Sequence, residues 1–263
     1  MSRWHAPARS SREQISSSKT QTSGGTPPRA ADWRDTAYAP GMSARRDPTR
    51  GPVVDHLVVA AATLDEGAAW IRERLGVETE VGGEHPAFGT HNRLLSLGPS
   101  DYLEVLAINP TVPKPCAAYP LGLDLPHVRA RLERGPFLLT WVVRVTGLVG
   151  DGVVELRRGE VRWRGTPRTD GALPLTGALP APIEWLTTPP WTALPDRGIR
   201  LESLTLTTTD PELLQRELQV WGWRGGTDGV GGDPRVRIMA GTDPGQAGLR
   251  ALVRTAAGVV ELS

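Results

Sequence analysis

The sequence is poor in the features that mark several common classes of protein. Its 263 residues include one cysteine, Cys116, which excludes an internal disulfide framework and suits a reducing cytoplasm. Lys and Arg number 30 against 29 for Asp and Glu, so the charge favours neither nucleic acid nor an anionic membrane surface. No apolar run approaches the ~20 residues needed to cross a bilayer, and the first residues lack the apolar segment of a secretory signal. We therefore expect a cytoplasmic protein with no nucleic-acid or membrane partner.

The first fifty residues differ from the rest of the chain. Residues 1–50 are rich in Ser, Arg, Pro, Gly and Thr, and they show no hydrophobic period. Such a segment cannot bury enough apolar surface to offset the entropy lost on ordering, so we expect a disordered extension. The chain as a whole contains 30 Gly and 24 Pro, which indicates many short elements joined by turns and favours a strand-rich α+β fold.

A strand, a helix and three further strands are predicted between residues 51 and 110. The run VVDHLVVAAA at 53–62 is apolar and rich in β-branched residues, as in a buried strand. Thr63 and Glu66 then match a capping box, and Gly76 follows the last residue of the helical apolar period. The three strands that follow are predicted at 77–83, 91–97 and 102–108.

Strand alternation predicts which side chains face the concave side of this sheet. In the strand 102–108 alternate positions are wholly apolar and should pack beneath the helix, which turns Tyr102 and Glu104 to the other face. The same test turns Asn92 toward the concave side. The first strand is apolar on both faces, so the pattern permits His56 to share the face of Glu104 without requiring it.

His56 and Glu104 are the candidate metal ligands, because imidazole and carboxylate both bind divalent ions well. A histidine that is merely hydrogen-bonded within the sheet fits the first strand equally well. His85 and His91 flank the loop HPAFGTH, and both could contact a ligand at the rim of the cup. A polar loop without such a role is the alternative.

An internal repeat suggests a modular architecture. Residues 55–76 and 201–222 align without a gap, and Glu261 near the chain end then corresponds to Glu104. A Trp-rich, strand-rich segment without a clear helix lies between the two copies, and Glu184 in it has a setting like that of Glu104. We read its Trp residues mainly as core packing, although one of them could line the cup.

These patterns predict an α+β fold of βαβββ modules that form a curved mixed sheet, a cup, with helices outside. The segments are module A (51–110), a connector (111–136), a degenerate module B (137–190) and a βαβββ module C (191–263). Either B completes the cup with A and C is an appendage, or A faces a composite of B and C. A homodimer would also accommodate the third module.

The runs DHLVVA, GGEHPAFGTHN and YLEVLAINP, with a helix that ends in RLG, resemble the glyoxalase-like branch of the vicinal oxygen chelate (glyoxalase/bleomycin resistance/dioxygenase) superfamily. The resemblance implies a cup built from paired βαβββ modules. In its metal-binding members a His on the first strand and a Glu on the last strand of a module hold a divalent ion, which chelates two adjacent substrate oxygens. The second His of such sites has no counterpart here.

Two functions follow from the resemblance. One is a metal-dependent lyase, isomerase or dioxygenase acting on a small organic substrate with adjacent oxygens. In that case His56 and Glu104 would bind the metal, and Glu184 or Glu261 would be a further ligand or general base. Asn92, Tyr102 and His91 would contact the substrate in either function. The other is a metal-free cup that binds or sequesters a small molecule, as drug-resistance members do. The absent second His favours this alternative, whereas His56 and the three strand-end acids favour the enzyme.

Overall fold

The computed structural model describes residues 51–263 except 116–117, 169 and 225–231. The expectations for residues 1–50 and for Cys116 lie outside the described residues. In chain order the strands and α-helices are β1 (Val53–Ala60), α1 (Leu64–Leu75), β2 (Glu80–His85), β3 (Thr90–Ser96), β4 (Tyr102–Ile108), α2 (Pro126–Leu132), β5 (Phe137–Arg144), β6 (Val154–Arg158), β7 (Val161–Gly165), β8 (Ala181–Trp185), β9 (Arg200–Thr208), α3 (Pro211–Val220), β10 (Val236–Ala240), β11 (Gly248–Thr255) and β12 (Gly258–Leu262).

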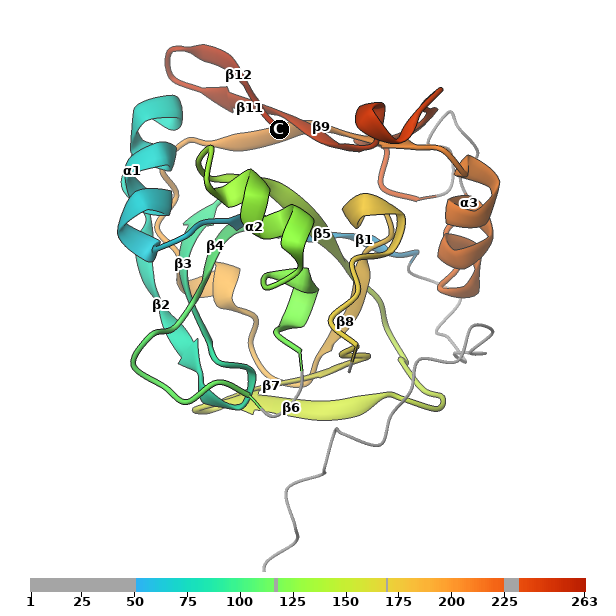
Figure 1. The fold of residues 1–263 in the computed structure, drawn as a ribbon, viewed down its shortest axis with the longest axis horizontal. Helices are drawn as coiled ribbons and strands as arrows, with labels where there is room; N and C mark the ends of the chain where they lie inside the picture. Colours follow the sequence, from blue (N-terminus) through green and yellow to red (C-terminus); the bar gives the residue numbers. More distant parts are fainter. Residues whose placement is uncertain (1–50, 116–117, 169, 225–231) are drawn as a thin grey trace, which may run out of the picture. The chain divides into compact units, whose positions relative to one another are not determined.

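Eight strands form one strongly curved mixed sheet, so the α+β fold expected from the sequence is confirmed. Their order is β2-β3-β4-β1-β5-β8-β7-β6, and the central β1 pairs parallel with β4 and antiparallel with β5. The two halves therefore join along β1 and β5. The sheet curls until its edge strands β2 and β6 meet, as the lower part of Figure 1 shows.

Helix α1 covers the outer face of the first half of this sheet. The Thr63 hydroxyl accepts the Glu66 N–H at 3.2 Å, and Gly76, with φ 71°, ends the helix in the left-handed conformation that glycine adopts readily. The helix buries Ile71 and Leu75 in the same core cluster as Leu103 of β4. The capped, amphipathic helix predicted from the sequence thus lies where strand alternation places it.

A second, four-stranded sheet has the order β10-β9-β11-β12. Its elements follow one another as strand, helix and three strands, but their pairing differs from that of the first half. Strand β9 lies directly beside its parallel partner β10, whereas β1 pairs with β4, the last strand of its own unit. Residues 191–263 therefore share an element order with residues 51–110 and not a sheet topology.

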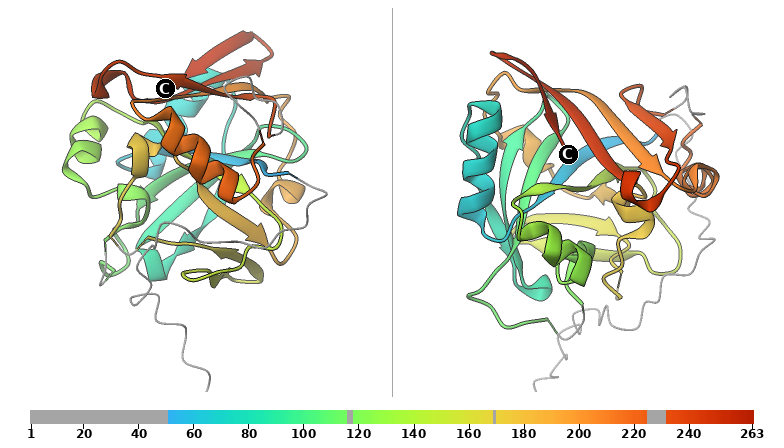
Figure 2. Two further views of the ribbon diagram at one scale, coloured as in Figure 1. Left: turned by 90° about the vertical axis from the view of Figure 1, so that its right-hand side faces the viewer. Right: turned by 45° about the horizontal axis from the view of Figure 1, so that its top comes forward.

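The second sheet packs against the outer face of the first sheet at β5 (Figures 1 and 2). Trp141 of β5 meets Trp223 edge to face, with ring centroids 5.9 Å apart, and the Leu138 N–H donates to the Ser263 carbonyl at 3.2 Å. All residues between β5 and β6 are described, and they form no helix. The second sheet covers the outer face of the second half, where a βαβββ module would place its helix.

This arrangement removes the third, unpaired module that motivated a homodimer. Residues 51–110 and 137–190 build the curved sheet together, and residues 191–263 cover its outer face. A homodimer remains a prediction, but an unpaired third module no longer supports it. No helix among the described residues is long and apolar enough to cross a membrane.

The inside of the curved sheet is apolar at one end. Val58 of β1 and Leu106 of β4 pack there with Val128 of α2, in a cluster separate from the core beneath α1. Figure 1 shows α2 lying across this part of the sheet. Strand β1 is apolar on both faces because each face meets its own core.

Candidate functional site

A cavity of about 180 Å³ lies inside the curved sheet. Its polar lining comes from four strands of the first half, from the edge strand β6 of the second and from the residue that follows β7. The polar side chains that line it are His56, His85, Thr90, Asn92, Tyr102, Glu104, Arg158 and Thr166. Phe88, Trp163 and Trp185 contribute aromatic walls.

His56 lines the cavity from β1, and the preceding residue, Asp55, is buried beside its imidazole. The pairing of β1 with β5 shifts register between Val54 and His56, so Asp55 is the extra residue of a β-bulge. In a regular strand the two neighbouring side chains would point to opposite faces. Here the His56 Nδ1 lies 2.7 Å from the Asp55 Oδ1, and the Trp185 Nε1–H donates to the Asp55 Oδ2 at 2.9 Å. The buried carboxylate therefore fixes the orientation of the imidazole.

Glu104 approaches the other side of the same imidazole. Its Oε2 lies 3.5 Å from the His56 Nε2, and its Oε1 accepts the Asn92 side-chain N–H at 2.5 Å. The Tyr102 ring stacks on His56 with centroids 4.5 Å apart and planes inclined by 22°. His56, Glu104, Asn92 and Tyr102, four of the predicted site residues, thus lie together.

The buried pair of His56 and Glu104 has strongly shifted pKa values. Burial by itself would lower the pKa of His56, but the hydrogen bonds and charges of Asp55 and Glu104 outweigh it and raise that pKa to about 9. Burial would raise the pKa of Glu104, yet its interactions with His56, and more weakly with His85 and Asn92, lower it to about 2. Without a bound metal the pair is an imidazolium and a carboxylate at neutral pH.

Asn92 connects Glu104 with a second group of polar residues. Its Oδ1 accepts the Gly83 backbone N–H at 2.7 Å and an Arg158 N–H at 3.3 Å. The same Arg158 Nη1 donates to the His85 Nε2 at 3.0 Å, and the His85 Nδ1 contacts the Thr90 hydroxyl at 3.0 Å. Burial, and to a lesser degree the Arg158 charge, lowers the pKa of His85, so this imidazole is neutral and can accept the Arg158 hydrogen bond.

The GlyGly pair of β2 makes room for this network. A Cβ at Gly82 would lie 2.0 Å from the Asn92 Oδ1 and 2.6 Å from the Asn92 carbonyl oxygen. We expect Gly82→Ala to displace Asn92 and to lower the free energy of unfolding by about 1–3 kcal/mol, the usual cost of overpacking. Denaturant unfolding measures this effect, and Val81→Ala on the same strand, with a side chain 82% exposed, is the control. Equal stability of the two variants would contradict the proposed crowding.

The predicted acids of the second half lie elsewhere. Ile183 and Trp185 of β8 face the cavity, so alternation turns Glu184 to the outer side. There its carboxylate accepts the N–H groups of Gly147 and Leu148 at 2.6 and 3.2 Å, in the loop between β5 and β6. The expectation that Glu184 lies in the cup is corrected, because its carboxylate secures this loop.

Glu261 and His91 are also outside the cavity lining. Glu261 lies on the edge strand β12 of the second sheet, where its exposed carboxylate is 3.4 Å from the Arg250 Nε. His91 precedes Asn92 on β3 and therefore points to the opposite face. Both are corrected as candidate site residues: Glu261 belongs to a different sheet, and His91 to the outer face of its strand.

Sequence reasoning missed Asp55 and Arg158 and did not select His85. The signal for Asp55 was available, because a carboxylate within an apolar strand is costly to bury unless it is paired, and its neighbour is a histidine. Arg158 and His85 carried no comparable signal, because their contact depends on the meeting of β2 and β6.

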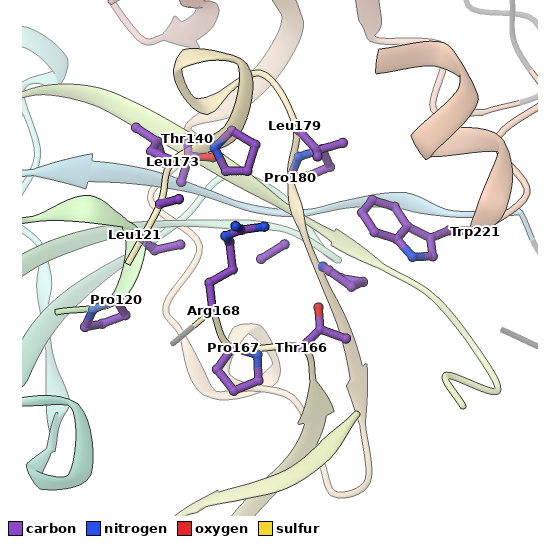
Figure 3. A pocket seen from close by; sticks show the side chains of 14 residues that line it. Pro120, Leu121, Thr140, Thr166, Pro167, Arg168, Leu173, Leu179, Pro180 and Trp221 are labelled. Atoms are coloured by element: carbon purple, nitrogen blue, oxygen red, sulfur yellow. The ribbon is translucent and has the colours of Figure 1, made fainter. Parts of the chain in front are cut away.

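Two Trp residues lie in the core and two others line the main cavity. Trp141 and Trp223 are buried in the core, whereas Trp163 and Trp185 line the cavity. A smaller cavity of about 90 Å³ adjoins the main one and shares part of its wall. Figure 3 shows its mostly apolar lining, in which Leu121, Leu173, Leu179 and Pro180 surround the Arg168 side chain.

His56 and Glu104 offer two ligands to a divalent ion. Their converging Nε2 and Oε2 atoms and the Asp55 carboxylate behind the imidazole match the carboxylate–histidine–metal arrangement. No group of three or more His, Cys, Asp or Glu that could hold a metal occurs among the described residues. On β5 the residue paired with His56 is Val142, an apolar residue of the cavity wall. The donor set therefore fits a metal with two protein ligands and leaves its other positions to a ligand or water.

Comparisons with known proteins agree with this architecture. The family model described as "Glyoxalase-like domain" matches residues 54–222, more than half of the chain. The chain therefore belongs to the glyoxalase-like domain family, within the vicinal oxygen chelate superfamily. None of the curated proteins matches the sequence significantly.

Three similar solved structures have low sequence identity to this chain. A hypothetical protein from Staphylococcus aureus is 14% identical with a TM-score of 0.48, over 73% of this chain and 87% of the other. Methylmalonyl-CoA epimerase from Mycobacterium tuberculosis is 19% identical with a TM-score of 0.32, over 52% of this chain and 89% of its own. A Streptomyces coelicolor methylmalonyl-CoA epimerase variant, in complex with 2-nitronate-propionyl-CoA, is 17% identical with a TM-score of 0.29, over 50% and 92%.

Proposed function

We propose that this glyoxalase-like protein is a lyase, isomerase or dioxygenase that binds a small organic substrate through two adjacent oxygens on a divalent metal ion held by His56 and Glu104. The observation that carries the proposal is the convergence of the His56 Nε2 and the Glu104 Oε2, 3.5 Å apart, inside the cavity. Two ligands about 2.1 Å from one metal are separated by roughly 3.0–3.4 Å, which is close to this distance.

Each neighbouring residue has a defined part in this proposal. Asp55 orients the imidazole so that its Nε2 faces Glu104, and Asn92 holds the second carboxylate oxygen of Glu104. The Asn92 Oδ1 accepts hydrogen bonds from Gly83 and Arg158, which hold the amide in place, so Asn92 positions Glu104 while it lines the cavity. A bound divalent ion would supply Lewis acidity toward the substrate oxygens.

Tyr102 would contact the substrate as a neutral donor. Burial, reinforced by the charges of Asp55 and Glu104, raises the pKa of its hydroxyl well above the ordinary value. The hydroxyl therefore keeps its proton at any physiological pH. Its ring stacks on His56 at the cavity wall, so a substrate next to His56 also lies next to Tyr102.

A metal-free binding protein is the second candidate function. Most residues that the second half contributes to the cavity lining are apolar, and the His56 imidazolium can satisfy Glu104 directly without a metal. In this case the cavity would bind a small molecule and release it unchanged. Its volume of about 180 Å³ lies below the roughly 300–1,000 Å³ of sites for drug-sized ligands, so either function predicts a small ligand.

Metal binding distinguishes the two functions. We expect tag-free protein dialysed against Mn²⁺, Ni²⁺ or Zn²⁺ to retain about one ion per chain, and His56→Ala and Glu104→Gln to lose it. Glu104→Gln keeps the shape of the side chain and its acceptor for Asn92, while His127→Ala, on the exposed face of α2, is the control. Elemental analysis after dialysis gives the stoichiometry. Absence of retained metal in the wild-type protein would reject the metal-dependent function in favour of the binding protein.

A further inference from the structure

Arg158 is the charged side chain of the cavity that the proposed metal site does not use. It is the last residue of β6, and its side chain extends to β2 where these two edge strands meet. A Cβ at Gly83 would lie 2.8 Å from the Arg158 Cδ, so glycine at this position lets the arginine stem lie directly over β2. The guanidinium consequently enters the cavity rather than the solvent.

The hydrogen-bond acceptors of this guanidinium are neutral side chains. Its Nη1 donates to the His85 Nε2 at 3.0 Å and to the Asn92 Oδ1 at 3.3 Å. Among the described residues no carboxylate lies within ion-pair distance of Arg158, and none accepts a hydrogen bond from its Nε or Nη2. Arg235 differs, because this similarly half-buried arginine is paired with both Asp101 and Asp233.

The buried carboxylates near the cavity have partners other than Arg158. They are those of Asp55 and Glu104, and His56 lies between them. The Arg144 Nη1 lies 3.6 Å from the Asp55 Oδ2. Neither carboxylate is therefore paired with Arg158. A guanidinium that is partly removed from water, and that has no carboxylate partner, is a strong binding site for an anion.

The cavity walls next to Arg158 suit an apolar group. Phe88, Trp163 and Trp185 line the same cavity, and the neighbouring cavity continues its apolar wall. Aromatic side chains in such walls favour planar or bulky apolar substituents. A ligand that fills this space would therefore combine an anionic group with an apolar one.

We propose that the ligand is a small carboxylate with an apolar substituent, and that the fork formed by the Arg158 Nε and Nη2 binds its carboxylate. This names the substrate class of the proposed function, and it rests on that function for the location of the cavity's ligand. The carboxylate contact itself requires no metal. Planar two-point binding of this kind is specific to arginine and is only partly reproduced by lysine.

Matched acid and amide probes test this inference on the metal-free full-length chain. Benzoate, phenylacetate and mandelate are each compared with the corresponding neutral amide by calorimetry. We expect at least one acid to bind wild-type protein about 10- to 100-fold more tightly than its amide, the range of a charge-assisted hydrogen-bond pair. Arg158→Met should abolish this preference and Arg158→Lys should retain part of it. Arg157→Met, on the exposed neighbour in β6, is the matched control and should leave it unchanged.

Three results would overturn the inference: no binding of any of the acids, equal affinity for acid and amide, or an undiminished preference in Arg158→Met. If Arg158→Met fails to fold, Gly83→Ala displaces the same guanidinium and should cause the same loss. Mn²⁺ retention is measured separately on each variant. An acid preference in a protein that retains no Mn²⁺ would reject the metal-dependent function and leave the role of Arg158 standing.

Discussion

At pH 8 the protein is expected to bind Mn²⁺ roughly 100-fold more tightly than at pH 6. The His56 Nε2 must lose its proton to bind a metal. The pKa of His56 is raised to about 9 because its interactions with Asp55 and Glu104 outweigh the effect of burial. Below that pKa each pH unit costs about tenfold in apparent affinity, since protons compete for the same nitrogen. Titrations of Mn²⁺ at pH 6, 7 and 8 measure this dependence.

A histidine with an unshifted pKa would give a weaker pH dependence of Mn²⁺ affinity. With a pKa near 6.5 the apparent affinity would change only about fourfold over the same interval. A fourfold change would therefore contradict the buried ion pair of His56 and Glu104. Proton NMR titration of the metal-free protein provides an independent reading of the His56 pKa, and His127→Ala should leave both measurements unchanged.

Trp141→Ala is expected to lower the free energy of unfolding by about 3–5 kcal/mol, the range for removing a large buried aromatic side chain. Trp141 is fully buried, meets Trp223 edge to face, and donates its Nε1–H to the Ala178 carbonyl at 2.9 Å. The substitution removes the contact of Trp141 with Trp223, which lies between the curved sheet and the second sheet, and leaves the Ala178 carbonyl without this partner. Denaturant unfolding monitored by circular dichroism measures the loss.

Two further variants separate the contribution of packing from that of the hydrogen bond and provide a surface control. Trp141→Phe keeps most of the packing and removes the hydrogen bond, so its effect should be clearly smaller. Met239→Ala, at a side chain that is 55% exposed, should change the stability by less than about 1 kcal/mol. A similarly small effect of Trp141→Ala would show that the second sheet is held by other contacts.

Local patterns predicted the first half of the fold well. Thr63 and Gly76 bound a helix whose apolar face meets the strands, and alternation along β4 placed Glu104 and Tyr102 in the cavity. These predictions succeed because a capping residue and a two-residue period depend on neighbours in the sequence. The pairing of β9 with β10 could not be read in this way, because strand order depends on contacts between distant segments.

Only the part of the candidate site that the first half contributes was predicted from the sequence. His56, Glu104, Asn92 and Tyr102 come from strands whose faces the apolar pattern defines, and they lie together. Glu184 was placed in the cup by analogy with Glu104, although Ile183 and Trp185 on either side of it are the larger apolar side chains and face inward. Asp55 was missed because a bulge breaks the alternation on which the prediction depended.

The pairing of the second sheet also sets where this folded unit can be divided. The family match ends at residue 222, just after α3, yet both strands that flank β9 come later in the chain. A fragment cut at that point would hold β9 with both of its backbone edges bare, and the Trp141 face of β5 would lose much of its apolar cover. Such a fragment would be prone to strand-mediated aggregation. For expression, truncation or fusion, the cooperative unit built around the cavity therefore extends through β12.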